Sequence, residues 1–159
     1  PQDTLTDLVV FTDGSCIQKL GKACAACVWP EGEFEDQAFF LPELSARTSN
    51  RAEFLAAIKA GEQADTIDPG RQRVLHIYTD SMLLVKTMTM WVHGWRRNSW
   101  RKADGAPVKN LDLIKALVDQ GAARTTKFTH VKAHTDGADY CSVWNDRAEK
   151  CAQAAVRSD

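Results

Sequence analysis

Residues 8–15 read Leu-Val-Val-Phe-Thr-Asp-Gly-Ser. The first five residues form a β-rich run, and a carboxylate, Asp13, follows it directly. A second apolar run, residues 74–79, leads in the same way to Asp80. Both runs have the length and the residue types that are typical of strands. The sequence therefore predicts two strands that each lead to an acidic side chain.

Two further carboxylates, Glu53 in Asn-Arg-Ala-Glu and Asp146 in Trp-Asn-Asp-Arg-Ala, stand in runs with helical character. Strand ends and helix faces can bring such distant side chains to one point. Four clustered carboxylates repel each other unless cations lie among them, so we predict a divalent-metal site. Hard oxygen ligands favour magnesium or manganese. Each residue alone would indicate only a turn, a helix cap or a first-turn acid.

The length of 159 residues fits one domain with its own core, spanning residues 1–159. No apolar run approaches the ~18 residues that a membrane helix needs, and the polar N-terminus carries no secretory signal. We therefore expect an intracellular protein that does not enter membranes and whose five cysteines are reduced. Cys24 and Cys27 match a C-x-x-C pattern, but strand geometry points these positions to opposite faces, which favours packing over zinc or redox chemistry.

Charge is distributed unevenly along the chain. The formal net charge is −1, yet residues 95–109 hold five basic side chains against one acidic side chain. A compact basic patch on a near-neutral protein suggests contact with a polyanion. Tryptophans at helical spacing usually pack a core, as we expect of Trp100, but the adjacent basic residues favour a nucleic-acid role for Trp91 and Trp95.

The order of strand-like and helix-like runs predicts an α/β domain with a mixed sheet, opened by an antiparallel meander of three strands. Asp80 and Ser81 are expected to cap a helix, and residues 48–50 offer further caps. We expect strands at 8–12, 23–29, 34–41, 74–79 and 127–131, helices at 51–64, 81–93, 110–120 and 145–156, and a short helix at 95–100.

Seven segments together resemble the type 1 ribonucleases H, in family order and with family spacing over nearly the whole chain. They are Phe-Thr-Asp-Gly-Ser-Cys at 11–16, Thr-Ser-Asn-Arg-Ala-Glu at 48–53, Tyr-Thr-Asp-Ser-Met at 78–82, the tryptophan-rich basic stretch at 91–100, Pro-Val-Lys-Asn at 107–110, His-Val-Lys-Ala-His at 130–134 and Asn-Asp-Arg-Ala at 145–148. The resemblance implies a ribonuclease H-like fold, in which a five-stranded mixed sheet has three antiparallel strands, then two parallel ones, flanked by helices.

The resemblance also implies an endonuclease that hydrolyses the RNA strand of RNA–DNA hybrids and leaves 5′-phosphate and 3′-hydroxyl ends. Asp13, Glu53, Asp80 and Asp146 would bind two Mg²⁺ ions, for which Mn²⁺ can substitute, and Asp13 would bridge them. His134 would assist product release or proton transfer, although a plain surface-loop histidine is the alternative. Most members act as monomers, and we expect a monomer here.

Substrate contacts follow from the same resemblance. Short polar side chains beside Glu53 would read the ribose 2′-hydroxyls that mark RNA. Other residues would hold the DNA strand, and a basic protrusion at about 91–110 would add salt-sensitive affinity. The implied residues are Ser49 and Asn50 for the RNA strand, Thr48, Trp91, Trp95 and Asn110 for the DNA strand, and Arg96, Arg97, Arg101 and Lys102 for the protrusion.

Several positions depart from the family pattern. Ala46 stands where members often have a phosphate-binding arginine, and Arg47, one position later, is the candidate to replace it. Leu83 occupies a position where some members carry an aromatic ring. The loop at 17–22 has fewer glycines than in many members. These departures bear on affinity for the nucleic acid more than on the chemistry.

Three alternatives remain open from the sequence. A ribonuclease H domain excised from a reverse transcriptase would perform the same chemistry, and the flanking sequence in its gene would identify it. A module that binds hybrids without cutting them would not need the four carboxylates. A related nuclease or transposase that acts on DNA would not need the side chains that read 2′-hydroxyls or the basic protrusion.

Overall fold

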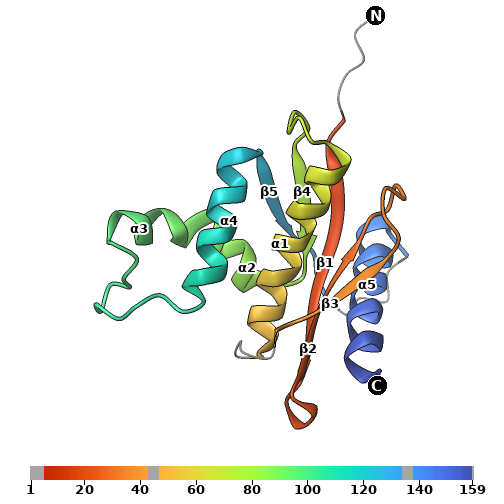
Figure 1. Cartoon of the computed structure of the whole chain (residues 1–159), viewed down its shortest axis with the longest axis horizontal. Helices are drawn as coiled ribbons and strands as arrows, with labels where there is room; N and C mark the ends of the chain where they lie inside the picture. Colours follow the sequence, from red (N-terminus) through yellow and green to blue (C-terminus); the bar gives the residue numbers. More distant parts are fainter. Residues whose placement is uncertain (1–5, 43–46, 134–137, 159) are drawn as a thin grey trace, which may run out of the picture.

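The computed structural model describes residues 6–42, 47–133 and 138–158. These residues contain a five-stranded sheet with helices on both faces (Figure 1). The strands are β1 (Leu8–Ile17), β2 (Lys22–Val28), β3 (Gln37–Phe40), β4 (Leu75–Thr79) and β5 (Thr126–His130).

The sheet has the order β3-β2-β1-β4-β5. Strands β1, β2 and β3 pair antiparallel, whereas β4 pairs parallel to both β1 and β5. This arrangement confirms the mixed sheet expected from the sequence. Strand β1 runs five residues beyond the predicted end at residue 12, because Asp13 to Ile17 pair with β2 up to the hairpin that joins the two strands.

The described helices are α1 (Ser49–Ile67), α2 (Met82–Lys86), the π-helical segment η2 (Thr87–Trp91), α3 (Val92–Arg97), α4 (Leu111–Ala123), α5 (Tyr140–Arg157) and the short 3₁₀ turn η1 (Gln18–Leu20). Thr48 caps α1 by accepting a hydrogen bond from the Arg51 N–H, and Ser81 caps α2 through the Leu84 N–H. Both caps had been expected from the sequence.

The structure corrects several predicted helix bounds, and two of these corrections have a clear local cause. Helix α5 begins at Tyr140 rather than at 145, because the Asp139 side chain accepts a hydrogen bond from the Ser142 N–H and starts the helix earlier. No helix spans 95–100, because α3 ends at Arg97 and both Ser99 and Trp100 adopt left-handed backbone conformations with φ of 53° and 62°. A left-handed residue cannot continue a right-handed helix.

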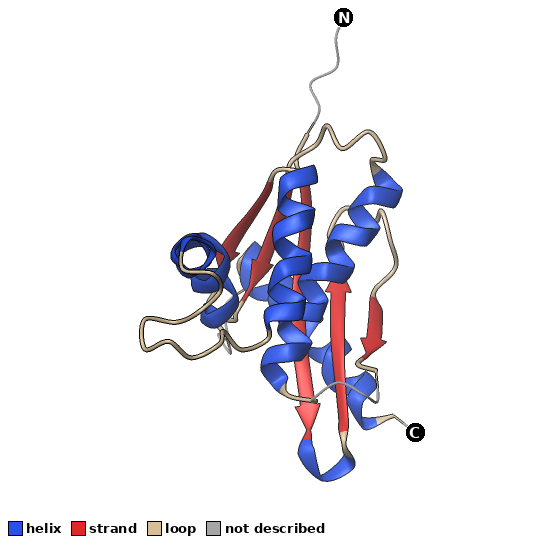
Figure 2. Cartoon of the chain, turned by 60° about the vertical axis from the view of Figure 1, so that its left-hand side comes forward, coloured by secondary structure: helices blue, strands red, loops and turns tan. Residues whose placement is uncertain are grey.

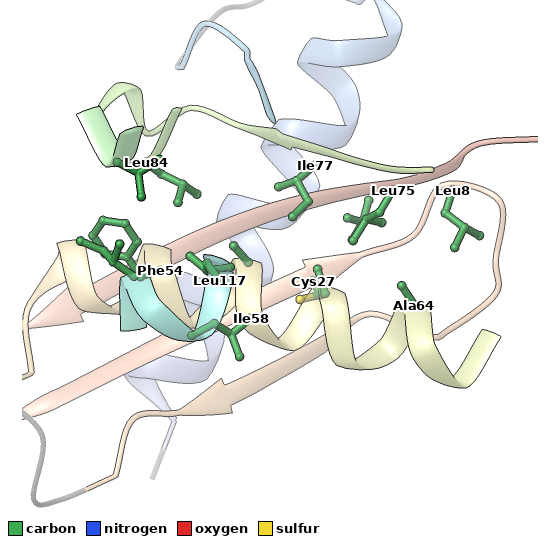
Figure 3. Close-up of a cluster of buried hydrophobic side chains, with 14 of the residues drawn as sticks. Leu8, Cys27, Phe54, Ile58, Ala64, Leu75, Ile77, Leu84 and Leu117 are labelled. Carbon is green, nitrogen blue, oxygen red and sulfur yellow. The ribbon is translucent and has the colours of Figure 1, made fainter. Parts of the chain in front are cut away.

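The sheet separates two apolar clusters. On one face, β1, β2 and β4 pack against α1 and α4; Figure 3 shows this cluster, which includes Leu75, Ile77, Phe54 and Leu117. On the other face, a smaller cluster centred on Phe11 packs against α5. Figure 2 shows the helices that cover the strands. Because successive strand residues alternate between faces, β1 contributes to both clusters and lies at the centre of the fold.

Cys24 and Cys27 lie in the interior of the protein, as expected for packing residues. Both are buried and neither forms a disulfide. The Cys27 thiol donates a hydrogen bond to the Ala56 carbonyl oxygen at 3.3 Å, and burial raises the pKa of this thiol. Within the described part of the chain, no helix combines the length and the hydropathy needed to span a bilayer.

Candidate metal centre and nucleic-acid interface

Three carboxylates from three different elements meet at one point. Asp13 lies in β1, Asp80 directly follows β4, and Glu53 lies in the second turn of α1. One oxygen from each carboxylate lies within 4.8 Å of an oxygen of the other two. The parallel pairing of β1 with β4 sets Thr12 opposite Thr79, so the next residue of each chain segment is an acid at the same end of the sheet.

Gly14 permits the close approach of α1 to β1. A Cβ atom at this position would lie 2.5 Å from the backbone nitrogen of Glu53 and 2.7 Å from the carbonyl carbon of Ala52. Both neighbours are backbone atoms, which cannot rotate aside as a side chain could. The glycine after Asp13 is therefore the residue that lets Glu53 reach the carboxylate on β1.

Burial and mutual repulsion perturb the cluster strongly. Asp13 is 5% exposed, and burial, followed by the charge of Asp80, raises its pKa to about 8. Burial and then the charges of Asp13 and Asp80 raise the pKa of Glu53 well above its ordinary value. Without a cation, the cluster therefore retains a proton near neutral pH. A hydrogen bond joins the side chains of Asp13 and Glu53.

The donor set fits a hard divalent cation. The three side chains are carboxylates, and Oε1 of Glu53 is buried and has no hydrogen-bond partner among the residues that the structure describes. An unpaired, buried carboxylate oxygen is costly, and a bound Mg²⁺ or Mn²⁺ would compensate it. Within the described residues, this is the one group of three or more acidic, histidine or cysteine side chains close enough to hold a metal.

The structure does not bring Asp146, the fourth predicted carboxylate, into this cluster. Asp146 lies on the exposed side of α5, where its carboxylate forms an ion pair with Nζ of Lys150 at 2.9 Å. Glu149, one turn after the buried Asn145, is half-buried, and its charge adds a minor part to the raised pKa of Asp13, after burial and the charge of Asp80. The role predicted for Asp146 as a metal ligand stays a prediction.

Helical phase is the signal that distinguishes the two acids. The buried residues of α5 are Asn145, Ala148, Ala152 and Val156, which follow the spacing of three and four residues of a helix face. Glu149 borders this stripe, four residues after Asn145, whereas Asp146 lies next to Asn145 and about 100° around the helix. The predicted histidine, His134, lies outside the described residues.

The start of α1 and the start of α4 lie beside each other. Arg51 joins them, because its guanidinium donates to Oδ1 of Asn110 at 3.3 Å and pairs with Asp112 at 2.7 Å. Thr48, Ser49 and Asn50 are exposed at the N-terminus of α1. Asn50 and Asn110 also line one cavity of about 180 Å³. The polar residues predicted to contact the two strands of a hybrid therefore gather near Glu53.

Trp91 and Trp95 lie where the chain leaves the body of the protein. Their ring centroids are 6.0 Å apart, and both rings line a groove of about 400 Å³ that Arg97 and Arg101 also line. Trp100 packs against the main apolar cluster, as expected. Helix α3 and the loop that follows it project away from the sheet (Figure 1), carrying Arg96 and the half-buried Lys102 as well.

Arg47 occupies a structural position in the described chain. Its guanidinium donates to the carbonyl oxygen of Gly21, and its own carbonyl oxygen accepts a hydrogen bond from the Cys16 thiol at 3.1 Å. These contacts tie Arg47 to the hairpin between β1 and β2. Leu83 packs against the main apolar cluster and lines the same cavity as Asn50.

Comparisons with known proteins agree with this geometry. The family model described as RNase H matches residues 6–157. A ribonuclease H of Nitrosomonas eutropha is 34% identical over 94% of this chain and 89% of its own length. A ribonuclease H of Novosphingobium aromaticivorans is 35% identical over 92% of this chain and 94% of its own.

Two solved structures share the fold. The first is LC9-RNase H1, a type 1 RNase H with the type 2 active-site motif, whose TM-score is 0.71 at 24% identity, covering 98% of this chain and 74% of its own. The second is a foamy viral protease-reverse transcriptase in complex with an RNA/DNA hybrid, whose TM-score is 0.74 at 18% identity, covering 94% of this chain and 20% of its own.

The raised pKa of Asp13 predicts how the stability of the cation-free protein depends on pH. Because the folded pKa is about 8 and the ordinary value is 3.8, the folded state binds the proton more tightly than the unfolded chain does. The contribution of Asp13 to the free energy of unfolding should therefore fall as pH rises between these two values. Asp13→Asn removes this contribution, so the stability of wild type relative to the variant should fall with pH. Urea denaturation of both proteins in EDTA at several pH values measures the difference, and a difference that stays constant or grows with pH would contradict the prediction.

Proposed function

The chain belongs to the ribonuclease H family, and from that premise we propose that it cleaves the RNA strand of RNA–DNA hybrids endonucleolytically. The observation that supports this proposal most strongly is the cluster of Asp13, Glu53 and Asp80, buried enough to need a compensating cation. Phosphodiester hydrolysis needs an activated water and a stabilised leaving oxygen, which divalent cations between carboxylates can provide.

We propose that Asp13, Glu53 and Asp80, of which Asp13 is the most buried, would hold two Mg²⁺ ions. When bound, the ions would activate the attacking water and stabilise the departing 3′-oxygen, which leaves 5′-phosphate and 3′-hydroxyl ends. The protein contributes rigid placement, because β1 and β4 are paired strands and Gly14 fixes the approach of α1. Mn²⁺ has the same preference for oxygen ligands and would substitute.

For the carboxylate from α5 we propose Glu149 in place of Asp146. Glu149 is half-buried, borders the buried stripe of α5 and adds to the raised pKa of Asp13, whereas Asp146 is exposed and pairs with Lys150. The longer glutamate side chain extends the reach of a helix that packs across the sheet. His134 keeps its proposed role in product release or proton transfer.

The proposed substrate contacts surround this centre. Ser49 and Asn50 are exposed beside Glu53, where short polar side chains can read 2′-hydroxyls. Thr48 and Asn110, brought near each other by Arg51, would bind a phosphate of the DNA strand. The paired rings of Trp91 and Trp95 would lie along the DNA sugars, and Arg96, Arg97, Arg101 and Lys102 would contact phosphates.

A labelled RNA strand tests the proposal directly. The strand is offered alone, paired to RNA and paired to DNA, each with Mg²⁺ and with EDTA. We expect internal cleavage of only the DNA-paired RNA, and only with Mg²⁺. Asp80→Asn should abolish cleavage while hybrid binding, measured by fluorescence anisotropy, survives. Binding by the wild-type protein without cleavage would identify a non-cutting module, and cleavage of DNA would move the chain to another branch of the superfamily.

A pair of variants on α5 tests which acid acts in the metal centre. Glu149→Gln should lower kcat by about 100-fold or more, because it removes a charge that faces the cations. Asp146→Asn should change kcat by less than about twofold, because an exposed ion pair contributes little. Both variants are neutral and nearly isosteric, so they serve as controls for each other. The opposite ranking would restore Asp146 to the metal centre.

The basic protrusion can be tested by its salt dependence. Replacing Arg96, Arg97, Arg101 and Lys102 with alanine should raise KM for the hybrid and leave kcat within about twofold, since these residues are proposed to bind phosphates remote from the cleavage point. Each lost phosphate contact should also reduce the slope of log affinity against log salt by roughly one. An unchanged slope in anisotropy titrations would show that the patch does not touch phosphate.

A further inference from the structure

Asn145 is a buried polar residue on the otherwise apolar face of α5. Only 3% of its surface is exposed, and its neighbours along that face are Ala148, Ala152 and Val156. Burying a carboxamide among alanines costs free energy unless its hydrogen bonds are satisfied. An apolar side chain such as leucine or alanine would be buried on this helix face without that cost, so packing alone does not account for the asparagine.

One half of the carboxamide contacts the candidate metal centre. Nδ2 of Asn145 donates a hydrogen bond to Oδ2 of Asp80 at 3.3 Å. This bond connects α5 with the end of β4, two elements that are 65 residues apart in the chain. Because the donor is neutral, it can hold one carboxylate oxygen without cancelling the negative charge that attracts a cation. A lysine at this position would cancel that charge, and an aspartate would add to the repulsion.

The carboxamide oxygen of Asn145 lacks a hydrogen-bond donor in the described part of the chain. Oδ1 of Asn145 is buried and accepts no hydrogen bond from the described residues. An unsatisfied buried acceptor costs roughly 1–3 kcal/mol, and native proteins retain few of them. Because Nδ2 of the same carboxamide contacts Asp80, a water molecule bound at the carboxylate cluster would be a proton donor able to satisfy Oδ1.

We propose that Asn145 is a positioning residue for the metal centre, which holds Asp80 through Nδ2 and whose Oδ1 would accept a hydrogen bond from water in the site when a cation is bound. The inference rests on the metal-dependent activity proposed above. Residues that orient metal ligands typically contribute about 10- to 100-fold to metal affinity or activity. The role also explains why a polar side chain persists on an apolar helix face, since its cost to the cation-free fold is compensated only when the cation is bound.

The test compares Asn145→Leu with wild type and with Gln153→Leu. Leucine keeps the branched skeleton of asparagine, with a somewhat larger volume, and removes both polar atoms, while Gln153→Leu makes the same kind of change two turns later on α5. Three quantities are measured: the affinity for Mg²⁺ by calorimetry, the thermal midpoint in EDTA, and kcat and KM on an RNA–DNA hybrid. Asn145→Asp, which keeps the shape but replaces the donor with an oxygen, serves as a second variant if the leucine protein fails to fold.

For Asn145→Leu we expect Mg²⁺ affinity and kcat to fall by about 10-fold or more, with KM for the hybrid within about twofold. The thermal midpoint in EDTA should stay level or rise, because an unsatisfied buried acceptor has been removed. Asn145→Asp should lose kcat similarly, and Gln153→Leu should behave as wild type in all three measurements.

A lowered midpoint with unchanged Mg²⁺ affinity and kcat would assign Asn145 a purely structural role and overturn the proposal. Wild-type kcat and Mg²⁺ affinity in both Asn145 variants would overturn it as well. These outcomes differ from failure of the proposed function, in which the wild-type protein itself would neither bind Mg²⁺ nor cleave the hybrid.

Discussion

The main constraint on this structure is that it must hold Asp13, Glu53 and Asp80 close together against their mutual repulsion. Burial raises the pKa of both Asp13 and Glu53, so the fold stores an electrostatic cost at the end of its central strands. Only a rigid frame can hold like charges together, and the frame here is a pair of parallel strands with apolar clusters on both faces. This cost would favour cation binding, because a divalent cation between the carboxylates would neutralise their repulsion.

Asp13 and Asp80 could be placed from sequence because each follows an apolar strand-like run, whereas the role of Glu53 was implied by the resemblance to the type 1 ribonucleases H. The close approach of α1 at Gly14, which brings Glu53 to Asp13, is visible only in the structure. The register that sets Thr12 opposite Thr79 could not be predicted, because pairing between strands so distant in sequence depends on the assembled core. That register brings Asp13 and Asp80 to the same level.

Helix α5 shows where the prediction from sequence ended. Both Asp146 and Glu149 lie in a plausible helical run, and the sequence of that run does not say which of its faces meets the sheet. In the structure the buried face consists of Asn145, Ala148, Ala152 and Val156. Small residues allow the close approach of this helix, and the phase of that contact leaves Glu149 half-buried and Asp146 exposed. The basic protrusion was also mispredicted at this level of detail. A helix was expected at 95–100, but Ser99 and Trp100 adopt left-handed conformations that composition does not predict.

Gly14 and Asn145 both help to bring the three carboxylates together, Gly14 beside α1 and Asn145 from α5. Gly14 removes a side chain so that Glu53 can approach Asp13, and Asn145 supplies a neutral donor so that Asp80 can be held without losing its charge. A positively charged partner in either place would relieve the repulsion and with it the attraction for a cation. Two basic residues that stand close in sequence to these acids, Lys150 just after Glu149 and Arg51 shortly before Glu53, pair with Asp146 and Asp112. Neither of these ion pairs involves Asp13, Glu53 or Asp80, so neither reduces the negative charge on which cation binding would depend.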